Sequence, residues 1–248
     1  KYIFRFPKFD AVAQKLRIEH KLLRFLQDRL PVLTPNPQFF SENPRGGPSP
    51  FLGYERIQGV SLDTIDLHQD ERLEIANQLG AFLHSLHSIP VAEVEVACDL
   101  TPDAHGDLED LEEKLKVIAK HLPHDIAEGC EKVLSEMSRK PQTSEAYALV
   151  HRDVYDGNVL VGHPRTVVRA VIDWNDAAIL DPAWDFVDLY AGGSDEQFWH
   201  KLIMAYGEQN PRGLEERVRY FAFAGNISGR AREIPHGWHR EDAPIKRR

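Results

Sequence analysis

The sequence predicts an α+β protein in which a small strand-and-helix part precedes a larger, mainly helical part that carries a β-hairpin. Three observations predict this fold class. Residues 2–6 alternate in the manner of a strand. Apolar residues recur at helical spacing in several later segments. Residues 159–161 and 167–172 are two β-branched runs joined by a short turn segment, which is the pattern of a hairpin.

Composition excludes several classes of protein. The chain has 248 residues, of which 42% are hydrophobic, and this is enough for one large domain or two small ones. A net charge of −9 argues against a nucleic-acid binder. Two cysteines exclude a disulfide scaffold and suggest a reducing compartment. We find neither a signal peptide nor an apolar run near the roughly 20 residues of a membrane span, and expect a soluble cytoplasmic protein.

The N-terminal third contains two predicted helices and a second predicted strand. Residues 11–30 carry one apolar stripe and end at a group of prolines that begins with Pro31. Residues 43–50 have the composition of a loop, and residues 51–57 form the next expected strand. A second helix leads up to Pro90, because the following residues repeat at helical spacing: Leu73, Ala76, Leu79, Leu83 and Leu86.

The rest of the chain is mostly helical around the hairpin. Residues 107–122 and 124–138 give two helices with charged outer faces, and residues 148–150 form a short apolar run. Beyond the hairpin, helical patterns cover three further segments: 182–191, 194–207 and 212–232.

The hairpin brings oxygen-bearing side chains together. With the turn centred near residues 164–165, antiparallel pairing places Asn158 roughly opposite Asp173. An amide oxygen beside a carboxylate is hard-oxygen ligation, which suits Mg²⁺ better than Zn²⁺. Asp153, five residues before Asn158, can orient a hydroxyl group and take its proton. One Asp in a loop is usually a turn residue, but three such groups at these spacings favour a catalytic site.

The same residues resemble a known family. His-Arg-Asp at 151–153, then Asn158 and Asp173, is similar to the kinase catalytic set. Four further segments resemble the aminoglycoside phosphotransferase and choline-kinase-like branch: 2–8, 82–89, 171–174 and 180–185. The resemblance implies a protein-kinase-like bilobal fold. Residues 1–58 would form a nucleotide-binding lobe that ends in a hinge, and residues 59–248 a helical lobe with the catalytic loop and acceptor site.

The resemblance also implies a role for each matching residue in the reaction. Asp153 would be the catalytic aspartate, and Asn158 and Asp173 the Mg²⁺ ligands. Lys8 would contact the phosphates of ATP or GTP, with Glu19 as its ion-pair partner.

Further positions match the residues that bind the nucleotide base or support the catalytic loop. Residues 51–57 resemble the hinge strand, so the backbone around Glu55 and Ile57 would bind the purine. Tyr54 and Ile172 are also assigned to the nucleotide site. Two residues would brace the catalytic loop: His151 and Asp185.

Departures from the kinase pattern narrow the function. Tyr155 stands where protein kinases carry Lys, and no Ala-Pro-Glu segment follows Asp173, which disfavours a protein kinase. The strands and glycine-bearing loop that cover the phosphates in relatives do not precede Lys1. We expect that the sequence omits an N-terminal segment; the alternative is a pseudoenzyme that binds nucleotide without transferring phosphate.

The expected activity is Mg²⁺-dependent transfer of a nucleotide γ-phosphate to a hydroxyl of a small molecule. An aminoglycoside antibiotic is the leading acceptor, because carboxylates at a pocket rim attract amines. The candidates, each by default an ordinary exposed acid, are Asp156, Asp188, Asp195, Glu196 and Glu233. The alternative acceptor is an amino alcohol, a sugar or a homoserine-like metabolite. His84 and His87 are expected to pack rather than to bind a metal.

Overall fold

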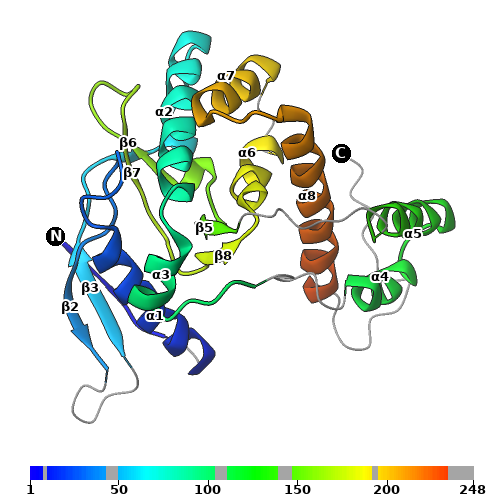
Figure 1. The fold of residues 1–248 in the computed structure, drawn as a ribbon, viewed down its shortest axis with the longest axis horizontal. Helices are drawn as coiled ribbons and strands as arrows, with labels where there is room; N and C mark the ends of the chain where they lie inside the picture. Colours follow the sequence, from blue (N-terminus) through cyan, green and yellow to red (C-terminus); the bar gives the residue numbers. More distant parts are fainter. Residues whose placement is uncertain (8–9, 43–49, 104–110, 139–146, 192–194, 234–248) are drawn as a thin grey trace.

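The computed structural model of this chain describes residues 1–7, 10–42, 50–103, 111–138, 147–191 and 195–233. Lys8, the expected loop at 43–50 apart from its last residue, and the start of the helix expected at 107–122 therefore lie outside the described residues. The α+β class is confirmed, with one small sheet and helix at the N-terminus and a larger helical part beyond it (Figure 1).

A three-stranded antiparallel sheet forms the N-terminal part. Its strands, in the order β1-β3-β2, are β1 (Tyr2–Arg5), β3 (Phe51–Glu55) and β2 (Pro37–Ser41). Helix α1 (Asp10–Leu26) packs against this sheet through the apolar stripe that the sequence shows. The strand β2 was not predicted, because it is short, begins with a proline and depends on pairing with β3.

The second part is organised around the long helix α2 (Gln69–His87), followed by α3 (Val91–Cys98). Near the C-terminus come α6 (Val187–Ala191), α7 (Glu196–Tyr206) and α8 (Pro211–Glu233). Beyond α8, at the far end of the molecule from the sheet, lie α4 (Leu111–Ala119) and α5 (His124–Ser138) (Figure 1). The helix over 124–138 is confirmed, whereas α3 was not predicted.

Short strands carry the loops of the candidate site. The hairpin of β6 (Val159–Val161) and β7 (Val168–Val171) is confirmed, and β4 (Val60–Ser61) extends it. A separate pair joins β5 (Ala148–Val150) to β8 (Ala178–Leu180), which was not predicted. Short 3-10 turns precede β6, at η3 (Asp156–Asn158), follow β4, at η1 (Leu62–Thr64), and follow β8, at η4 (Pro182–Phe186).

One hydrophobic cluster runs through both parts of the molecule. It includes Leu16 and Leu23 of α1, Leu52 of β3 and the buried face of α2. Leu33, in the segment after α1, also bonds to the hairpin, since Leu33 N donates to Arg169 O. The two parts therefore pack against a shared core, which holds the N-terminal sheet beside the hairpin.

Gly80 allows α2 and α7 to approach closely. A Cβ atom at this position would collide with the carbonyl oxygen of Leu202 and lie 2.7 Å from the Cβ of Ala205. We expect Gly80→Ala to destabilise the protein by about 1–3 kcal/mol, because α7 must shift. Gly129→Ala is the matched control: its Cβ meets nothing within 4 Å in α5, and we expect about 0.5–1 kcal/mol of stabilisation. Urea unfolding measures both, and equal effects would contradict the packing argument.

Candidate active site

A loop with a fixed backbone follows β5. The buried carboxylate of Asp185 accepts hydrogen bonds from His151 N at 2.9 Å and from Arg152 N at 2.6 Å. Arg152 has a φ of 69°, in the left-handed region that side chains other than glycine rarely adopt. Two short bonds to one carboxylate hold this conformation, so Asp185 sets the path of the loop into Asp153.

His151 ties the loop to the segment after β7. Its Nδ1 accepts from Asp153 N at 3.2 Å, so the ring proton lies on Nε2 and is donated to Ile172 O at 3.1 Å. Burial lowers the pKa of His151, and the ring stays neutral. Its role in this structure is to connect two backbone segments.

Behind Asp185 lies a buried chain of polar contacts that the sequence did not reveal. His87 Nε2 donates to Asp185 Oδ2 at 3.0 Å, because a carboxylate only accepts. His87 Nδ1 then accepts from the hydroxyl of Tyr206 at 3.0 Å, and burial raises the pKa of Tyr206, so the phenol keeps its proton. His87 is thus more than the packing residue we expected, although its contact is to a carboxylate rather than a metal.

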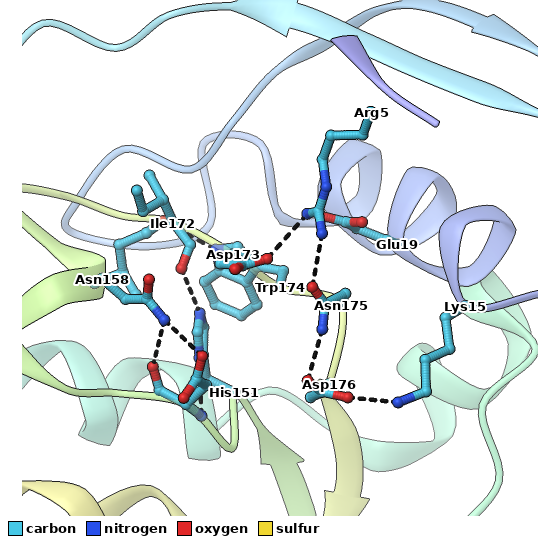
Figure 2. A network of polar contacts seen from close by, with 12 residues as sticks. Arg5, Lys15, Glu19, His151, Asn158, Ile172, Asp173, Trp174, Asn175 and Asp176 are labelled. Carbon is cyan, nitrogen blue, oxygen red and sulfur yellow. Dashed lines mark hydrogen bonds and ion pairs between the residues drawn. The ribbon is translucent and has the colours of Figure 1, made fainter. Parts of the chain in front are cut away.

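Asp153 and Asn158 face each other across the loop. Asn158 Nδ2 donates to Asp153 Oδ2 at 2.7 Å and to Asp153 O at 3.0 Å (Figure 2). Both partners are acceptors, so the amide nitrogen must point at Asp153 and the amide oxygen must point away. Burial raises the pKa of Asp153. The amide holds one carboxylate oxygen of Asp153, and the other accepts no hydrogen bond given by the described side chains.

The register of the hairpin differs from the expected one by one residue. Val159 pairs with Val171, and Ile172 N donates to Asn158 O at 3.0 Å, so Asn158 faces Ile172 rather than Asp173. A bulge between Leu160 and Val161 adds one residue to β7, and without it Asn158 would face Val171. Asp173 is the next residue and has a φ of 68°, a left-handed turn that ends the strand.

The residues present fit a hard divalent cation. Asp173 Oδ1 is shielded from solvent, and its contact among the described residues is the ion pair with Arg5 Nη1 at 3.0 Å. The amide oxygen of Asn158 is the second available oxygen ligand. No group of three His, Cys, Asp or Glu side chains in the described ranges could hold a metal by itself. A cation here would therefore need Asp173, Asn158 and oxygens of a bound phosphate.

Arg5 forms the ion pair with Glu19 that we expected of Lys8. Its Nη1 lies 2.5 Å from Glu19 Oε1 and 3.0 Å from Asp173 Oδ1, and its Nη2 donates to Asn175 at 2.7 Å (Figure 2). The predicted pair of Lys8 and Glu19 cannot be placed, since Lys8 lies outside the described residues. The alternation of side chains along the strand could have identified Arg5 from the sequence. Arg5 and Ile3 lie on one face of the sheet, and Tyr2 lies on the other.

The expected hinge residues fall at the end of β3. Tyr54 is buried on the inner face, whereas Glu55 is exposed and pairs with Tyr2. Ile57 is partly exposed, two residues beyond the strand. Side chains that alternate in this way cannot all face one ligand, so a purine could use only the backbone of Glu55 and Ile57.

Comparison with known proteins agrees with this geometry. The sequence profile of the phosphotransferase enzyme family matches residues 1–221. The chain belongs to this family. The chain is also similar to the amicoumacin kinase of Bacillus subtilis (strain 168), with 27% identity over 171 residues. That match covers 63% of this chain and 48% of the relative, so the chain spans about half the length of that curated relative.

Solved structures share the fold of this chain. The GDP and kanamycin complex of APH(2″)-IIIa is 25% identical, with a TM-score of 0.76, over 94% of this chain and 81% of that one. Macrolide 2′-phosphotransferase MphH from Brachybacterium faecium is 20% identical, with a TM-score of 0.74, over 99% of this chain and 86% of that one. The protein-kinase-like bilobal fold is confirmed by these matches.

Glu19 is nearly inaccessible to solvent, at 1% exposure. Burial raises its pKa from 4.5 to about 7, although Arg5 acts in the opposite sense. The folded protein therefore holds this proton to higher pH than the unfolded chain does. The stability that depends on the proton is complete below about pH 4.5 and is lost as the pH rises through about 7.

Glu19→Gln is expected to remove this pH dependence. Relative to the variant, the wild type should lose unfolding free energy between pH 4.5 and pH 7, by at most roughly 1.4 kcal/mol per unit of pKa difference. Urea unfolding across this range measures the slope, with the exposed Glu131→Gln as the control. Parallel curves for wild type and Glu19→Gln would contradict a protonated, buried Glu19.

The helices of the described residues include none with both the length and the apolar character that a bilayer span requires. Cys98 and Cys130 are both free thiols.

Proposed function

We propose that this phosphotransferase moves the γ-phosphate of ATP or GTP to a hydroxyl group of a small molecule, in the presence of Mg²⁺. The observation that carries the proposal is the pairing of Asp153 with Asn158, next to the segment that presents Asp173. The Asp153 carboxylate would bind the acceptor hydroxyl, and the side-chain oxygens of Asn158 and Asp173 would bind the metal. Phosphoryl transfer needs positioning and charge neutralisation of this kind.

On the acceptor side, Asp153 orients the reacting hydroxyl. The acceptor O–H donates to the free Asp153 oxygen, and its oxygen attacks the γ-phosphorus. A new P–O bond forms, the bond to the bridging oxygen of the nucleoside diphosphate breaks, and Asp153 takes the proton. Burial raises the pKa of Asp153, which makes the carboxylate a better base for this step.

On the donor side, Asn158 and Asp173 would hold Mg²⁺, which supplies charge neutralisation at the phosphates. Arg5 contributes a second positive charge, held by Glu19. The backbone of Glu55 and Ile57, with Ile172 from the other lobe, would hold the base, and we infer a lobe boundary near residue 58. Lys8 remains a proposed phosphate contact.

A small cavity beside the catalytic loop supports a cationic acceptor. Its volume is about 230 Å³, and one cation and three carboxylates line it: Arg72, Asp63, Asp156 and Asp188. The carboxylates outnumber the guanidinium, so the lining is negative overall. Burial raises the pKa of both Asp156 and Asp188, so a bound amine would stabilise their charged forms. Whole drug-sized ligands need about 300–1,000 Å³, so the cavity suits one ring or aminoalkyl arm of an acceptor.

The other acidic candidates have different positions. Asp195 caps α7 by accepting from Phe198 N at 2.8 Å, which is a structural role. Glu196 is exposed in the first turn of α7. Glu233 ends α8, and its side chain lies outside the described residues.

An aminoglycoside is the proposed acceptor. The kanamycin complex of APH(2″)-IIIa and the similarity to amicoumacin kinase both favour an antibiotic substrate. Such an activity would make the protein a resistance enzyme, and we propose that it acts in the cytoplasm, where nucleoside triphosphates are available. The alternative acceptors are an amino alcohol, a sugar and a homoserine-like molecule.

An acceptor panel tests the proposal. Purified protein with Mg²⁺ and ATP or GTP is offered kanamycin, choline, glucose and homoserine, and nucleoside diphosphate release is followed with mass analysis of the acceptor. We expect phosphorylated kanamycin, and raised resistance in cells that express the protein. Transfer to choline, glucose or homoserine but not to kanamycin would show that the acceptor is one of these alternatives and not an aminoglycoside. Nucleotide binding without transfer to any hydroxyl would favour the pseudoenzyme.

A further inference from the structure

A closed ring of polar contacts joins α1 to the segment that follows Asp173. It starts at Glu19, passes through Arg5, Asn175 and Asp176, and returns to α1 at Lys15 (Figure 2). Lys15 and Glu19 are four residues apart, so they share one face of the helix. The ring therefore ties one face of α1 to the turn that carries the proposed metal ligand.

Each link of the ring is short. Arg5 lies 2.5 Å from Glu19 and 2.7 Å from Asn175, Asn175 Nδ2 donates to Asp176 at 2.6 Å, and Lys15 donates to Asp176 at 2.5 Å. Arg5 also lies 3.0 Å from Asp173 Oδ1. A planar guanidinium can bond to acceptors in several directions at once, which a single ammonium does less well.

Asn175 is the neutral link between Arg5 and Asp176. Its Oδ1 must accept, since Arg5 only donates, and its Nδ2 must donate, since the Asp176 carboxylate only accepts. An amide is the group that does both in one plane. The chain could not pass from Arg5 to Asp176 through a carboxylate, because neither oxygen of Asp176 has a proton to donate.

The links differ in expected strength. Glu19 is 1% exposed and Arg5 26%, so their contact is shielded from water. Lys15 is 55% exposed and Asp176 41%, and exposed pairs contribute little. The part of the ring around Arg5 and Asn175 should therefore matter most, and the Lys15 link least.

We infer that Asn175 is a positioning residue, which holds the Arg5 guanidinium toward the phosphate site and fixes α1 to the turn at Asp173. This inference rests on the proposed function in one respect, namely that a nucleotide phosphate binds beside Asp173. Asn175 touches no reacting atom and acts through Arg5. Its loss should weaken binding of Mg-nucleotide and leave the acceptor side, built on Asp153, nearly unchanged.

A charge swap tests the ring link by link. In Asn175→Asp, the new carboxylate still accepts from Arg5, but it cannot donate to Asp176 and repels it. Adding Asp176→Asn supplies a donor at position 176, whose amide oxygen can still accept from Lys15. The double variant thus restores every link with the net charge of the wild type.

We expect Asn175→Asp to raise the Kd and the KM for Mg-nucleotide about tenfold, as the loss of one charge-assisted hydrogen bond predicts. The KM for the acceptor should change less than about twofold, and the double variant should return to within about threefold of wild type, since only an exposed ion pair is lost. Calorimetry measures Kd without any acceptor.

Lysine variants on α1 provide a matched control. Lys15→Met removes the exposed link of the ring and should raise the nucleotide Kd by about twofold. Lys21→Met removes a comparable exposed ion pair on the same helix, to Asp99, which lies outside the ring. It should leave the nucleotide Kd unchanged.

Hydrogen exchange separates this inference from the proposed function. In the nucleotide-free protein, amides of residues 173–177 should exchange faster in Asn175→Asp and return to the wild-type rate in the double variant. If the wild type binds no nucleotide, the proposed function fails. The exchange rates still show whether Asn175 holds the turn at residues 173–177 in place. Wild-type exchange in Asn175→Asp, or equal impairment of the single and double variants, would overturn the positioning role.

Discussion

Replacement of Asp153 by Asn is expected to lower kcat by about two to four orders of magnitude, the usual contribution of a positioned general base. The substitution keeps the shape of the side chain and removes its ability to take a proton. Asn158 still has the Asp153 backbone oxygen as an acceptor at 3.0 Å, so the loop should keep its conformation. Steady-state transfer to the acceptor identified in the panel, with calorimetric nucleotide binding, measures the effect.

A surface variant serves as a control, because it removes a carboxylate charge without touching the proposed general base. Asp99→Asn removes a carboxylate that is 71% exposed at the end of α3, and we expect unchanged kcat. Thermal unfolding of both variants should match the wild type within a few degrees, roughly the shift produced by less than 1 kcal/mol. A kcat of Asp153→Asn close to the wild-type value would remove Asp153 from the proposed chemistry.

Asp173→Asn is expected to weaken Mg-dependent nucleotide binding by about 100-fold, because an anionic ligand of a hard cation becomes neutral. Asn is the appropriate replacement, since Asp173 has a φ of 68° and Asn tolerates the left-handed region better than Ala does. Binding of nucleotide without Mg²⁺ should change little. The carboxylate is also 3.0 Å from Arg5, but Glu19 and Asn175 still hold that guanidinium in the variant.

Nucleotide affinity measured over a series of Mg²⁺ concentrations tests this role. The wild type should bind more tightly as Mg²⁺ rises, and Asp173→Asn should respond weakly. The Mg-free affinity serves as the internal control for correct folding of the site. An identical Mg²⁺ dependence in both proteins would exclude Asp173 as a metal ligand.

Elements with strong local patterns were predictable from the sequence. The stripe of α2 and the paired runs of β6 and β7 determine their own structure, since period and turn chemistry act over neighbouring residues. The strands β2 and β8 have three to five residues each and depend on partners distant in sequence. Propensity alone does not specify such strands, because the pairing itself stabilises them.

The site shows the same division. Asp153 and Asn158 belong to one loop, so their spacing in the sequence was enough to predict that they lie close together. Arg5 and Glu19 meet because a strand face and a helix face pack on each other, and that packing is tertiary. The chain from Asp185 through His87 to Tyr206 likewise joins three separate elements.

By itself, the sequence determined the α+β class, the hairpin and the short-range spacing of Asp153 and Asn158, because these depend on local periodicity and turn geometry. Only the tertiary structure decided that Arg5 pairs with Glu19, that Asn158 faces Ile172, and that Asn175 closes a ring with α1. Those contacts depend on a one-residue bulge and on the packing of distant faces, where a small shift in register changes which side chains meet.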